Sequence, residues 1–478
     1  MVAQLRQHRN RILKGRSTSL QVCLLRYSGS RIVSGVAYWP VAMMVHWQSI
    51  IWSFVSVLFS ILDTISAVEG RVSTGPKMRK FISGTQRHDT SFSLTQIRNP
   101  KWKPRDTTTT AVYAAGFLKH KVHMPKDLRV AWEILKSQDD RRANSSLHPR
   151  VGGQLVRYSD GQYVFPVTIG TPKQTLNLIF DTASGDFWVW SWLMPVDMLR
   201  NRKYYNGSAS SEGTPWDGQS WGATYAVGSN YGIVWQDIVW IDAIGVAGNP
   251  IECSQGVSNW FSSLPGVDGV LGLSYAYNDS ERPEPQQTWI TYVLPLLAAP
   301  VFTVSLVHDG VGIIDFGFID QKKYIGSIVY TPVTIIPGGG AFWAFNWTGF
   351  SIGSDKFNRT NIQVMTDTGG NISMFPESIA NRYYKLVVGS YKQTDGAWIF
   401  PCKAALPNFV FGVGNSRISV QGKNFILTNL PDGINCIGGI QSREEDTYVF
   451  LSIPFMQSIF VVHDYGNMRM GFANRTWV

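Results

Sequence analysis

The sequence has few of the residues on which metal centres and histidine-dependent nucleophiles rely. Of 478 residues, only 4 are cysteine and 8 are histidine, and no Cys-x-x-Cys pair occurs. After His148, histidine recurs only at His308 and His463. Zinc sites and Cys–His or Ser–His nucleophiles need such residues in clusters, so the sequence supports neither. We expect no metal and no other cofactor.

Long apolar runs are also scarce. The mean hydropathy is -0.05, and the chain lacks the repeated runs of about 20 apolar residues that a polytopic membrane protein needs. Hydrophobic residues make up 44% and charged residues 16% of the chain, with 18 Trp, 19 Tyr and 25 Phe. This composition can bury a sizeable core and excludes wholesale disorder.

The net charge of +10 is distributed unevenly. Residues 1–150 carry 24 Lys and Arg against 8 Asp and Glu, whereas residues 151–478 carry 19 against 25. The larger part of the chain is therefore mildly acidic, and we do not expect a body that binds nucleic acid. At roughly 150 residues per domain, the length suggests about three domains or one bilobal domain with appendages.

The N-terminal residues have the pattern of a targeting segment. Residues 1–32 contain seven Lys and Arg and no acid, and the uncharged run Ile50–Leu62 is thirteen residues long and precedes Ser66 and Ala67. This length suits a signal peptide better than a membrane span of about 20 residues. We expect secretion. The alternatives are a membrane anchor formed by residues 33–62 and an ordinary buried strand.

Residues 68–150 are polar and rich in Lys and Arg. Ala131–Leu135 could begin a short helix, but the segment has too few apolar residues for a core of its own. The pair Arg141–Arg142 has the character of an exposed linker that a processing protease could cut. One interpretation is a disordered linker, and the sharper one is a basic propeptide that covers an acidic body.

From Tyr158 onward, short runs of β-branched and aromatic residues alternate with Gly, Pro, Asn and Asp. This spacing predicts an all-β body, which at over 300 residues should form two packed units. Helical periodicity is scarce, and Pro376–Val388 is the best candidate for a helix. The expected strands are Tyr163–Ile169, Thr175–Phe180, Gly232–Val246, Val301–Leu306, Gly326–Pro332, Phe342–Ile352, Asn408–Gly412 and Phe460–His463.

Two similar peptides, Leu178–Val189 and Val364–Pro376, each run from an apolar strand into Asp-Thr and a small residue. A buried carboxylate at a strand end needs compensation, which the other aspartate could supply if the two met. Asp181 and Asp367 would then share one proton, because like charges resist ionising together. One would activate a water as general base, while the other polarised a carbonyl. The alternative is two unrelated turns that share Asp-Thr.

The surrounding motifs favour the paired aspartates, because the chain resembles the pepsin-like aspartic proteases, especially the secreted fungal, penicillopepsin-like group. The resemblance covers about residues 90–478. It implies a bilobal all-β fold with two lobes related by a pseudo-twofold axis, and an endopeptidase made as a zymogen and active at acid pH. The matching segments are Phe92–Pro104, Tyr163–Pro172, Val267–Leu273, Asp315–Asp320, Lys323–Tyr330 and Phe409–Gly414.

The resemblance also implies roles for individual residues. Asp181 and Asp367 match the catalytic pair, and Ser184 matches the residue that hydrogen-bonds one aspartate from outside. The other matches are Thr182 and Thr368 as inter-lobe threonines, Gly369 beside the second aspartate, Tyr225 on the flap, Trp188 supporting that tyrosine, and Cys402–Cys436 as the disulfide of the second lobe. Implied partners are polypeptide substrates, the chain's own propeptide and pepstatin-type inhibitors, for a monomer that binds no nucleic acid.

Several positions depart from the family pattern. Ala183 replaces the glycine of the first Asp-Thr-Gly, and a β-carbon at a glycine-only backbone angle costs on the order of 1 kcal/mol or more. Gly370 stands where the second motif usually has Ser or Thr, so Asp367 is expected to lack an outer hydrogen bond. Ala226 and Val227 replace Gly-Asp on the flap, and Leu451–Ser452 replaces Gly-Asp near the C-terminus. These changes leave open a divergent relative that binds peptides and is weakly active or inactive as a protease.

The predicted organisation is a basic leader with a signal peptide or anchor over 1–67, a propeptide over 68–150, and two β-lobes over 151–335 and 336–478. Cys253 is expected to be an unpaired buried residue. A β-rich carbohydrate-binding module is an alternative, although it would not need the duplicated aspartate peptide. Sequons that would suit a glycoprotein occur at Asn144, Asn206, Asn278, Asn346, Asn358, Asn371 and Asn474.

Overall fold

A computed structural model of the chain divides into two compact units, Met1–Arg79 and Lys80–Val478. In the first unit, β1 (Leu24–Ser28) and β2 (Arg31–Gly35) form an antiparallel hairpin, and the run Ile50–Leu62 lies outside the described residues. No helix in the described parts combines the length and apolar character needed to cross a bilayer. The structure describes residues 24–28, 31–35, 90–96, 106–119, 123–143, 155–157, 163–225, 228–257, 262, 264, 266–275, 280–308, 310–335, 342–443 and 448–476.

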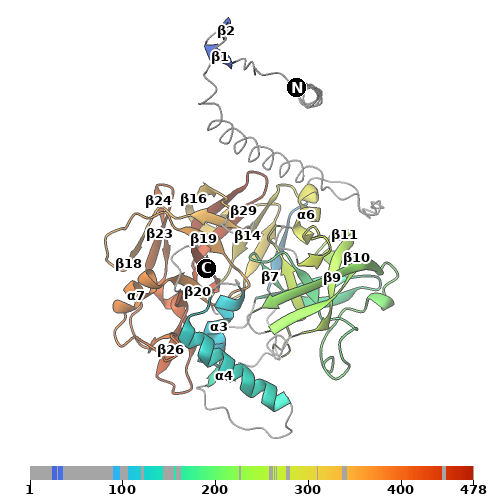
Figure 1. Cartoon of the computed structure of the whole chain (residues 1–478), viewed down its shortest axis with the longest axis horizontal. Helices are drawn as coiled ribbons and strands as arrows, with labels where there is room; N and C mark the ends of the chain where they lie inside the picture. Colours follow the sequence, from blue (N-terminus) through green and yellow to red (C-terminus); the bar gives the residue numbers. More distant parts are fainter. Residues whose placement is uncertain are drawn as a thin grey trace, which may run out of the picture. The chain divides into compact units, whose positions relative to one another are not determined.

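Strands dominate the second unit, as the sequence predicts (Figure 1). The largest sheet of its described residues has eight strands, and the first predicted catalytic aspartate ends one of its central strands. In spatial order these strands are β11 (Ile244–Gly256), β8 (Phe187–Val189), β12 (Gly269–Gly272), β7 (Gln174–Asp181), β6 (Val164–Ile169), β10 (Gly228–Ile241), β9 (Thr214–Tyr225) and β13 (Glu281–Arg282).

A second sheet repeats part of this arrangement. Its order is β17 (Ala344–Asn346), β19 (Gln363–Thr366), β28 (Tyr448–Leu451), β20 (Ser373–Pro376) and β27 (Ile440–Arg443). In the first sheet, β7 pairs in parallel with β12, β12 pairs antiparallel with β8, and β8 pairs in parallel with β11. In the second sheet, β19 pairs in parallel with β28, β28 pairs antiparallel with β20, and β20 pairs in parallel with β27. The two aspartate peptides therefore lie in equivalent places of a duplicated substructure.

A six-stranded sheet combines strands from distant parts of the sequence. Its order is β16 (Tyr324–Pro332), β30 (Arg469–Arg475), β29 (Ile459–Asp464), β14 (Val301–Ser305), β15 (Ile313–Phe316) and β3 (Phe92–Thr95). The edge strand β3 comes from the predicted propeptide and pairs with β15 in full register. This N-terminal segment therefore completes a sheet of the body.

Smaller elements complete the C-terminal half. Three strands, β18 (Phe350–Ile352), β23 (Phe409–Val413) and β24 (Ser416–Val420), form one sheet. Four others, β21 (Tyr391–Lys392), β22 (Trp398–Pro401), β26 (Asn435–Gly438) and β25 (Ile426–Asn429), form another. The helices are α7 (Glu377–Lys385) and α8 (Ile453–Met456), while α6 (Trp289–Val293) precedes β14.

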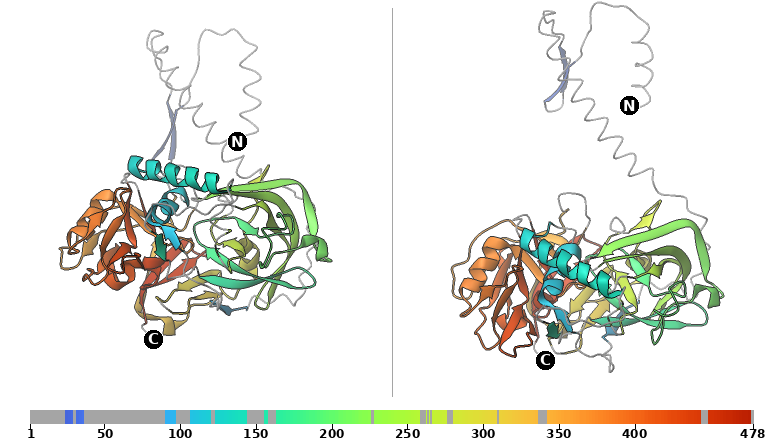
Figure 2. Two further views of the ribbon diagram at one scale, coloured as in Figure 1. Left: turned by 90° about the horizontal axis from the view of Figure 1, so that it is seen from below. Right: turned by 60° about the horizontal axis from the view of Figure 1, so that its bottom comes forward.

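Two helices of the N-terminal segment, α3 (Thr109–Lys119) and α4 (Lys126–Ala143), lie between the C-terminal strands and the long hairpin of β9 and β10 (Figure 2). On α3, Val112 and Phe117 are fully buried and share one apolar cluster with Met374 and Phe450 of the second lobe. This segment has too few apolar residues to form a core of its own, so its apolar side chains pack against the core of the body. The strand before α3, β4 (Asp106–Thr108), pairs with a strand that follows α4, β5 (Leu155–Arg157), and the two form a small antiparallel sheet.

Three local predictions need correction. Gly232–Val246 is two strands, because Asp242 has a φ of 51° and turns β10 into β11. Phe342–Ile352 is also two strands, β17 and β18, separated by Gly349 with a φ of 147°. Arg141–Arg142 lies within the last turn of α4, so the pair is helical and does not belong to an irregular linker. The helix predicted at Pro376–Val388 is confirmed as α7.

Candidate active site

The first aspartate turn follows β7, whose last four residues are buried. The Ala183 N–H donates to Asp181 Oδ1 at 2.9 Å, and Ser184 Oγ donates to Oδ2 at 2.8 Å. The described non-glycine residues with a positive φ are Asn201, Asp242 and Met468. Ala183 therefore has no glycine-only backbone angle, and the strain expected there is absent.

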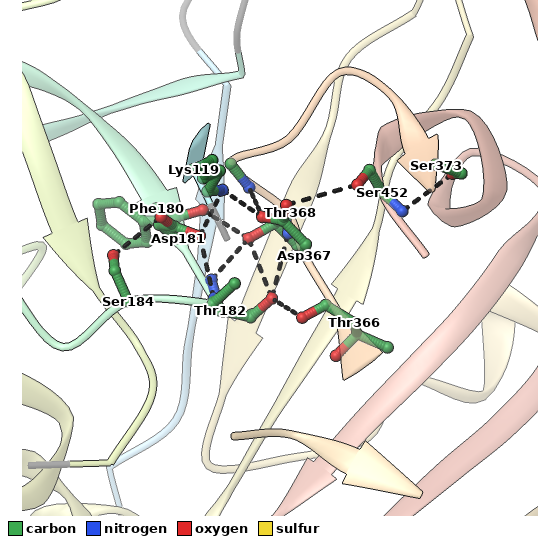
Figure 3. Close-up of polar contacts among 12 residues, drawn as sticks. Lys119, Phe180, Asp181, Thr182, Ser184, Thr366, Asp367, Thr368, Ser373 and Ser452 are labelled. Atoms are coloured by element: carbon green, nitrogen blue, oxygen red, sulfur yellow. Dashed lines mark hydrogen bonds and ion pairs between the residues drawn. The ribbon is translucent and has the colours of Figure 1, made fainter. Parts of the chain in front are cut away.

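The second aspartate turn follows β19, and Asp367 is fully buried. The Gly369 N–H donates to Asp367 Oδ1 at 3.0 Å, as its counterpart does on the first turn. Gly370 has no hydroxyl, but Ser452 Oγ donates to Asp367 Oδ2 at 3.4 Å (Figure 3). The expectation that Asp367 lacks an outer hydrogen bond is therefore wrong, because a residue 85 positions away in the sequence supplies one.

Two threonines connect the turns beneath the aspartates. Thr182 Oγ1 donates to the carbonyl of Thr366 at 3.0 Å and accepts from the Thr368 N–H at 3.1 Å. Thr368 Oγ1 donates to the carbonyl of Phe180 at 2.6 Å and accepts from the Thr182 N–H at 3.0 Å. All four bonds are buried, so they fix the two turns against each other where water does not compete.

One ammonium group joins the two carboxylates. Lys119 is the last residue of α3, and its Nζ donates to Asp181 Oδ1 at 3.1 Å and also bonds Asp367 Oδ1 (Figure 3). Because both bonds end on the same nitrogen, Asp181 and Asp367 face each other within the range of direct charge coupling. Burial lowers the pKa of Lys119, but the two aspartates raise it by more, so it stays above its usual value.

A histidine lies below the second turn. His463 is fully buried, its ring stacks on Phe302 with centroids 4.3 Å apart, and its Nε2 lies 3.3 Å from Thr366 Oγ1. Burial lowers the pKa of His463 to about 3. The imidazole is thus neutral above that pH, and it adds no positive charge beneath Asp367 in mildly acidic solution.

The other predicted residues are the flap tyrosine, its supporting tryptophan and the cysteines. Trp188 is fully buried and stacks on Trp221, with centroids 6.3 Å apart. Tyr225 is the last residue of β9, but its side chain, like Ala226 and Val227, lies outside the described residues. Cys402 and Cys436 form a disulfide, and Cys253 is free and buried, both as predicted. Among the described residues, no three His, Cys, Asp or Glu side chains are placed to hold a metal ion.

Sequence reasoning missed Lys119 and the contact made by Ser452. Lys119 is one of 24 basic residues in the first 150, so its type did not mark it. A usable signal was its position at the end of an apolar run, Ala111–Leu118, within a segment expected to cover an acidic cleft. Ser452 was noted as a departure from the family pattern, but the sequence did not connect it to Asp367.

Comparison with known proteins shows the family to which the chain is related. The sequence profile of the eukaryotic aspartyl proteases matches residues 162–475. The chain is 32% identical to podosporapepsin of Podospora anserina and 33% identical to endothiapepsin of Cryphonectria parasitica, over 80% of this chain and 90% of each relative. It is 34% identical to penicillopepsin-1 of Penicillium janthinellum, over 66% of this chain and 95% of that protein.

Proposed function

The chain belongs to the eukaryotic aspartyl protease family, and we propose that it is an acid endopeptidase made as a zymogen, in which Asp181 and Asp367 activate a water. The observation that carries the proposal is the convergence of both carboxylates on one point, the nitrogen of Lys119. A water at that point would contact both carboxylates at once. Its position would let one group remove a proton while the other donates one.

The hydrogen bonds around the two aspartates fit a pair in which one carboxylate accepts a proton and the other donates one. Each aspartate accepts a backbone N–H on Oδ1 and a hydroxyl on Oδ2. Such bonds favour the ionised form of a carboxylate, whereas two charges close together oppose double ionisation. We therefore propose that the two carboxylates share one proton in the active enzyme. The ionised member takes a proton from water as it attacks the peptide carbonyl, and the protonated member donates to the carbonyl oxygen.

The chemistry can be tested with two conservative variants. Asp181→Asn and Asp367→Asn keep the shape of each side chain but remove one carboxylate, so each should lower cleavage of a denatured protein by at least about a thousandfold. The parent should cut at acid pH and be blocked by pepstatin. If the parent binds peptides but does not cut them, an inactive relative is indicated. Pepstatin-sensitive cleavage by both variants would mean that other aspartates act.

We also propose that the segment around β3, α3 and α4 is an inhibitory propeptide. Lys119 occupies the space between the two aspartates, and 85% of its side chain is buried there. Other contacts hold the segment on the body. Thr110 Oγ1 donates to Asp395 Oδ2 at 2.9 Å, Tyr113 Oη donates to the carbonyl of Ser442 at 2.7 Å, and Ser93 Oγ donates to Asp315 Oδ1 at 2.6 Å.

Acid should release this segment. While Lys119 stays between the aspartates, both can remain ionised, and after its departure the pair takes up a proton. The released state therefore binds more protons, and falling pH favours it. Lys119→Met should allow release at a higher pH than in the parent, as followed by chain length on a gel and by activity. If the precursor stays full length while the body is active, another protease acting near Arg141–Arg142 would be favoured.

We propose secretion on the basis of the uncharged run Ile50–Leu62. Expression of the full chain in a secreting host tests this proposal. Processed protein should appear in the medium, with an N-terminus downstream of residue 67. A membrane-bound product that keeps residues 33–62 would support the anchor instead.

A further inference from the structure

The outer hydroxyl on each aspartate comes from a different place in the two lobes. On the first turn, Ser184 is three residues after Asp181 and donates to its Oδ2. On the second turn, the residue three after Asp367 is Gly370, which cannot donate in this way. Ser452 Oγ makes the equivalent bond to Asp367 Oδ2 (Figure 3), and this residue directly follows β28 and precedes α8.

Backbone hydrogen bonds establish which positions correspond. The Ser274 N–H donates to the carbonyl of Ser184 at 3.1 Å, and the Ile453 N–H donates to the carbonyl of Gly370 at 3.0 Å. Ser452, one residue before Ile453, thus corresponds to Leu273. The first lobe has its hydroxyl on the turn and an apolar residue on the adjacent strand, and the second lobe has the reverse.

The backbone around Ser452 is fixed on several sides. The Ser452 N–H donates to Ser373 Oγ at 3.1 Å, and its carbonyl accepts from the N–H groups of Phe455 and Met456 in α8. The Asp367 N–H donates to the carbonyl of Leu451 at 2.9 Å. Ser452 is fully buried. Its hydroxyl is thus held beside Asp367 by a network in which the neighbouring backbone groups are already engaged.

The space around Gly370 links the two departures from the family pattern. A β-carbon at Gly370 would lie 2.2 Å from Asp367 Oδ2 and 2.7 Å from Ser452 Oγ. Gly370 is absent from the glycines with positive φ in the described chain, so space, and not backbone angle, requires glycine there. A serine at position 370 and the observed pair of Ser452 and Asp367 therefore exclude each other.

We propose that Ser452 is the positioning residue for Asp367, replacing the hydroxyl that the second turn has lost. The proposal rests on the proposed function, since it concerns the same carboxylate pair. By donating to Oδ2, Ser452 fixes the carboxylate and leaves Oδ1 directed at the point where Lys119 now lies. The bond also favours the ionised form of Asp367, so it influences the pH range of activity.

The test compares the pH–rate profile of the acid-activated parent with those of three variants. Ser452→Ala should lower kcat/KM by about tenfold, as expected for one bond to a charged group, and move the profile to higher pH. Ser452→Thr keeps the donor and should restore the position of the profile. Ser458→Ala is the matched control, because Ser458 is a fully buried serine six residues further on whose Oγ accepts from Gln421 and Asn424. It should lower stability and leave the profile in place.

The outcomes separate this proposal from the function itself. If the parent cuts at acid pH and Ser452→Ala leaves the pH–rate profile unchanged, the positioning role is wrong, but the proposed protease function is supported. If the parent does not cut, unfolding of the full chain still tests the role. Ser452→Ala should then lower the unfolding temperature more at pH 5 than at pH 2, since the lost bond favours ionised Asp367. An equal loss at both pH values would overturn it.

Discussion

The two aspartate turns share their backbone contacts but differ in the side chains that support them. Each turn gives its aspartate one N–H bond, at 2.9 Å from Ala183 and 3.0 Å from Gly369. The first turn accommodates a β-carbon at Ala183. At Gly369 a β-carbon would lie 2.6 Å from Asp181 Cγ. The second turn thus packs closely against Asp181. The glycine of Asp-Thr-Gly is required for space in the second lobe and not in the first.

Departures from a duplicated motif should therefore be judged within their own lobe and together with one another. Ala183 departs at a position where the first turn has room. Gly370 and Ser452 each depart from the family pattern, yet together they preserve a hydroxyl on Asp367. Counting them as separate defects overstates the loss of function that the sequence suggests.

The largest effect should come from adding a β-carbon where the second turn has no room. Gly369→Ala would press its methyl on Asp181 and displace one aspartate from the other. Loss of a positioned catalytic interaction costs about 100- to 1000-fold in rate, and we expect a fall in kcat/KM of that size. The assay is cleavage of a peptide by the acid-activated protein. Activity within threefold of that of the parent would show that the second turn can shift to accommodate a β-carbon. The two lobes would then not differ in their need for glycine at this position.

The threonines should contribute equally, because their bonds are symmetrical. Thr182→Val and Thr368→Val each remove a buried hydroxyl that donates to a carbonyl and accepts an N–H. Leaving such groups unsatisfied costs about 1–3 kcal/mol. We expect similar losses in the free energy of unfolding by urea, and a double variant that loses less than the sum. A loss in one lobe more than twice that in the other would contradict the symmetry.

Removal of the first outer hydroxyl should have a somewhat larger effect than removal of the second. Ser184 Oγ lies 2.8 Å from Asp181 Oδ2, and the corresponding distance from Ser452 to Asp367 is 3.4 Å. Hydrogen bonds weaken with distance, and a bond to a charged group contributes about 1.5–3 kcal/mol. Ser184→Ala should therefore reduce kcat/KM by more than the tenfold expected for Ser452→Ala. A smaller effect at Ser184 would reverse this ranking.

Much of this architecture could be predicted from the sequence, because it depends on local patterns. The strand runs, the duplicated Asp-Thr peptides and α7 follow from alternating apolar residues and helical periodicity. The helix α3 could not be predicted in this way. Its buried residues pack on Met374 and Phe450 of the body, and a β-carbon at Gly116 would lie 2.7 Å from Met374 Sδ. Its structure depends on distant residues, as does the contact between Ser452 and Asp367.

The smallest effect should follow from restoring the family's glycine on the first turn. Ala183 already gives its N–H to Asp181, its backbone has no left-handed angle, and its side chain is only 9% exposed in an apolar cluster with α3. Ala183→Gly would remove one methyl from that cluster and increase backbone freedom, at a cost of about 0.5–1 kcal/mol of stability. Turnover by the acid-activated enzyme should change by less than about threefold, which corresponds to less than 1 kcal/mol. Because the methyl packs beside α3, the measurable change should be earlier release of the proposed propeptide as the pH falls. A large gain in turnover in Ala183→Gly would instead mean that the methyl obstructs the reaction, and that the first turn is the defective one.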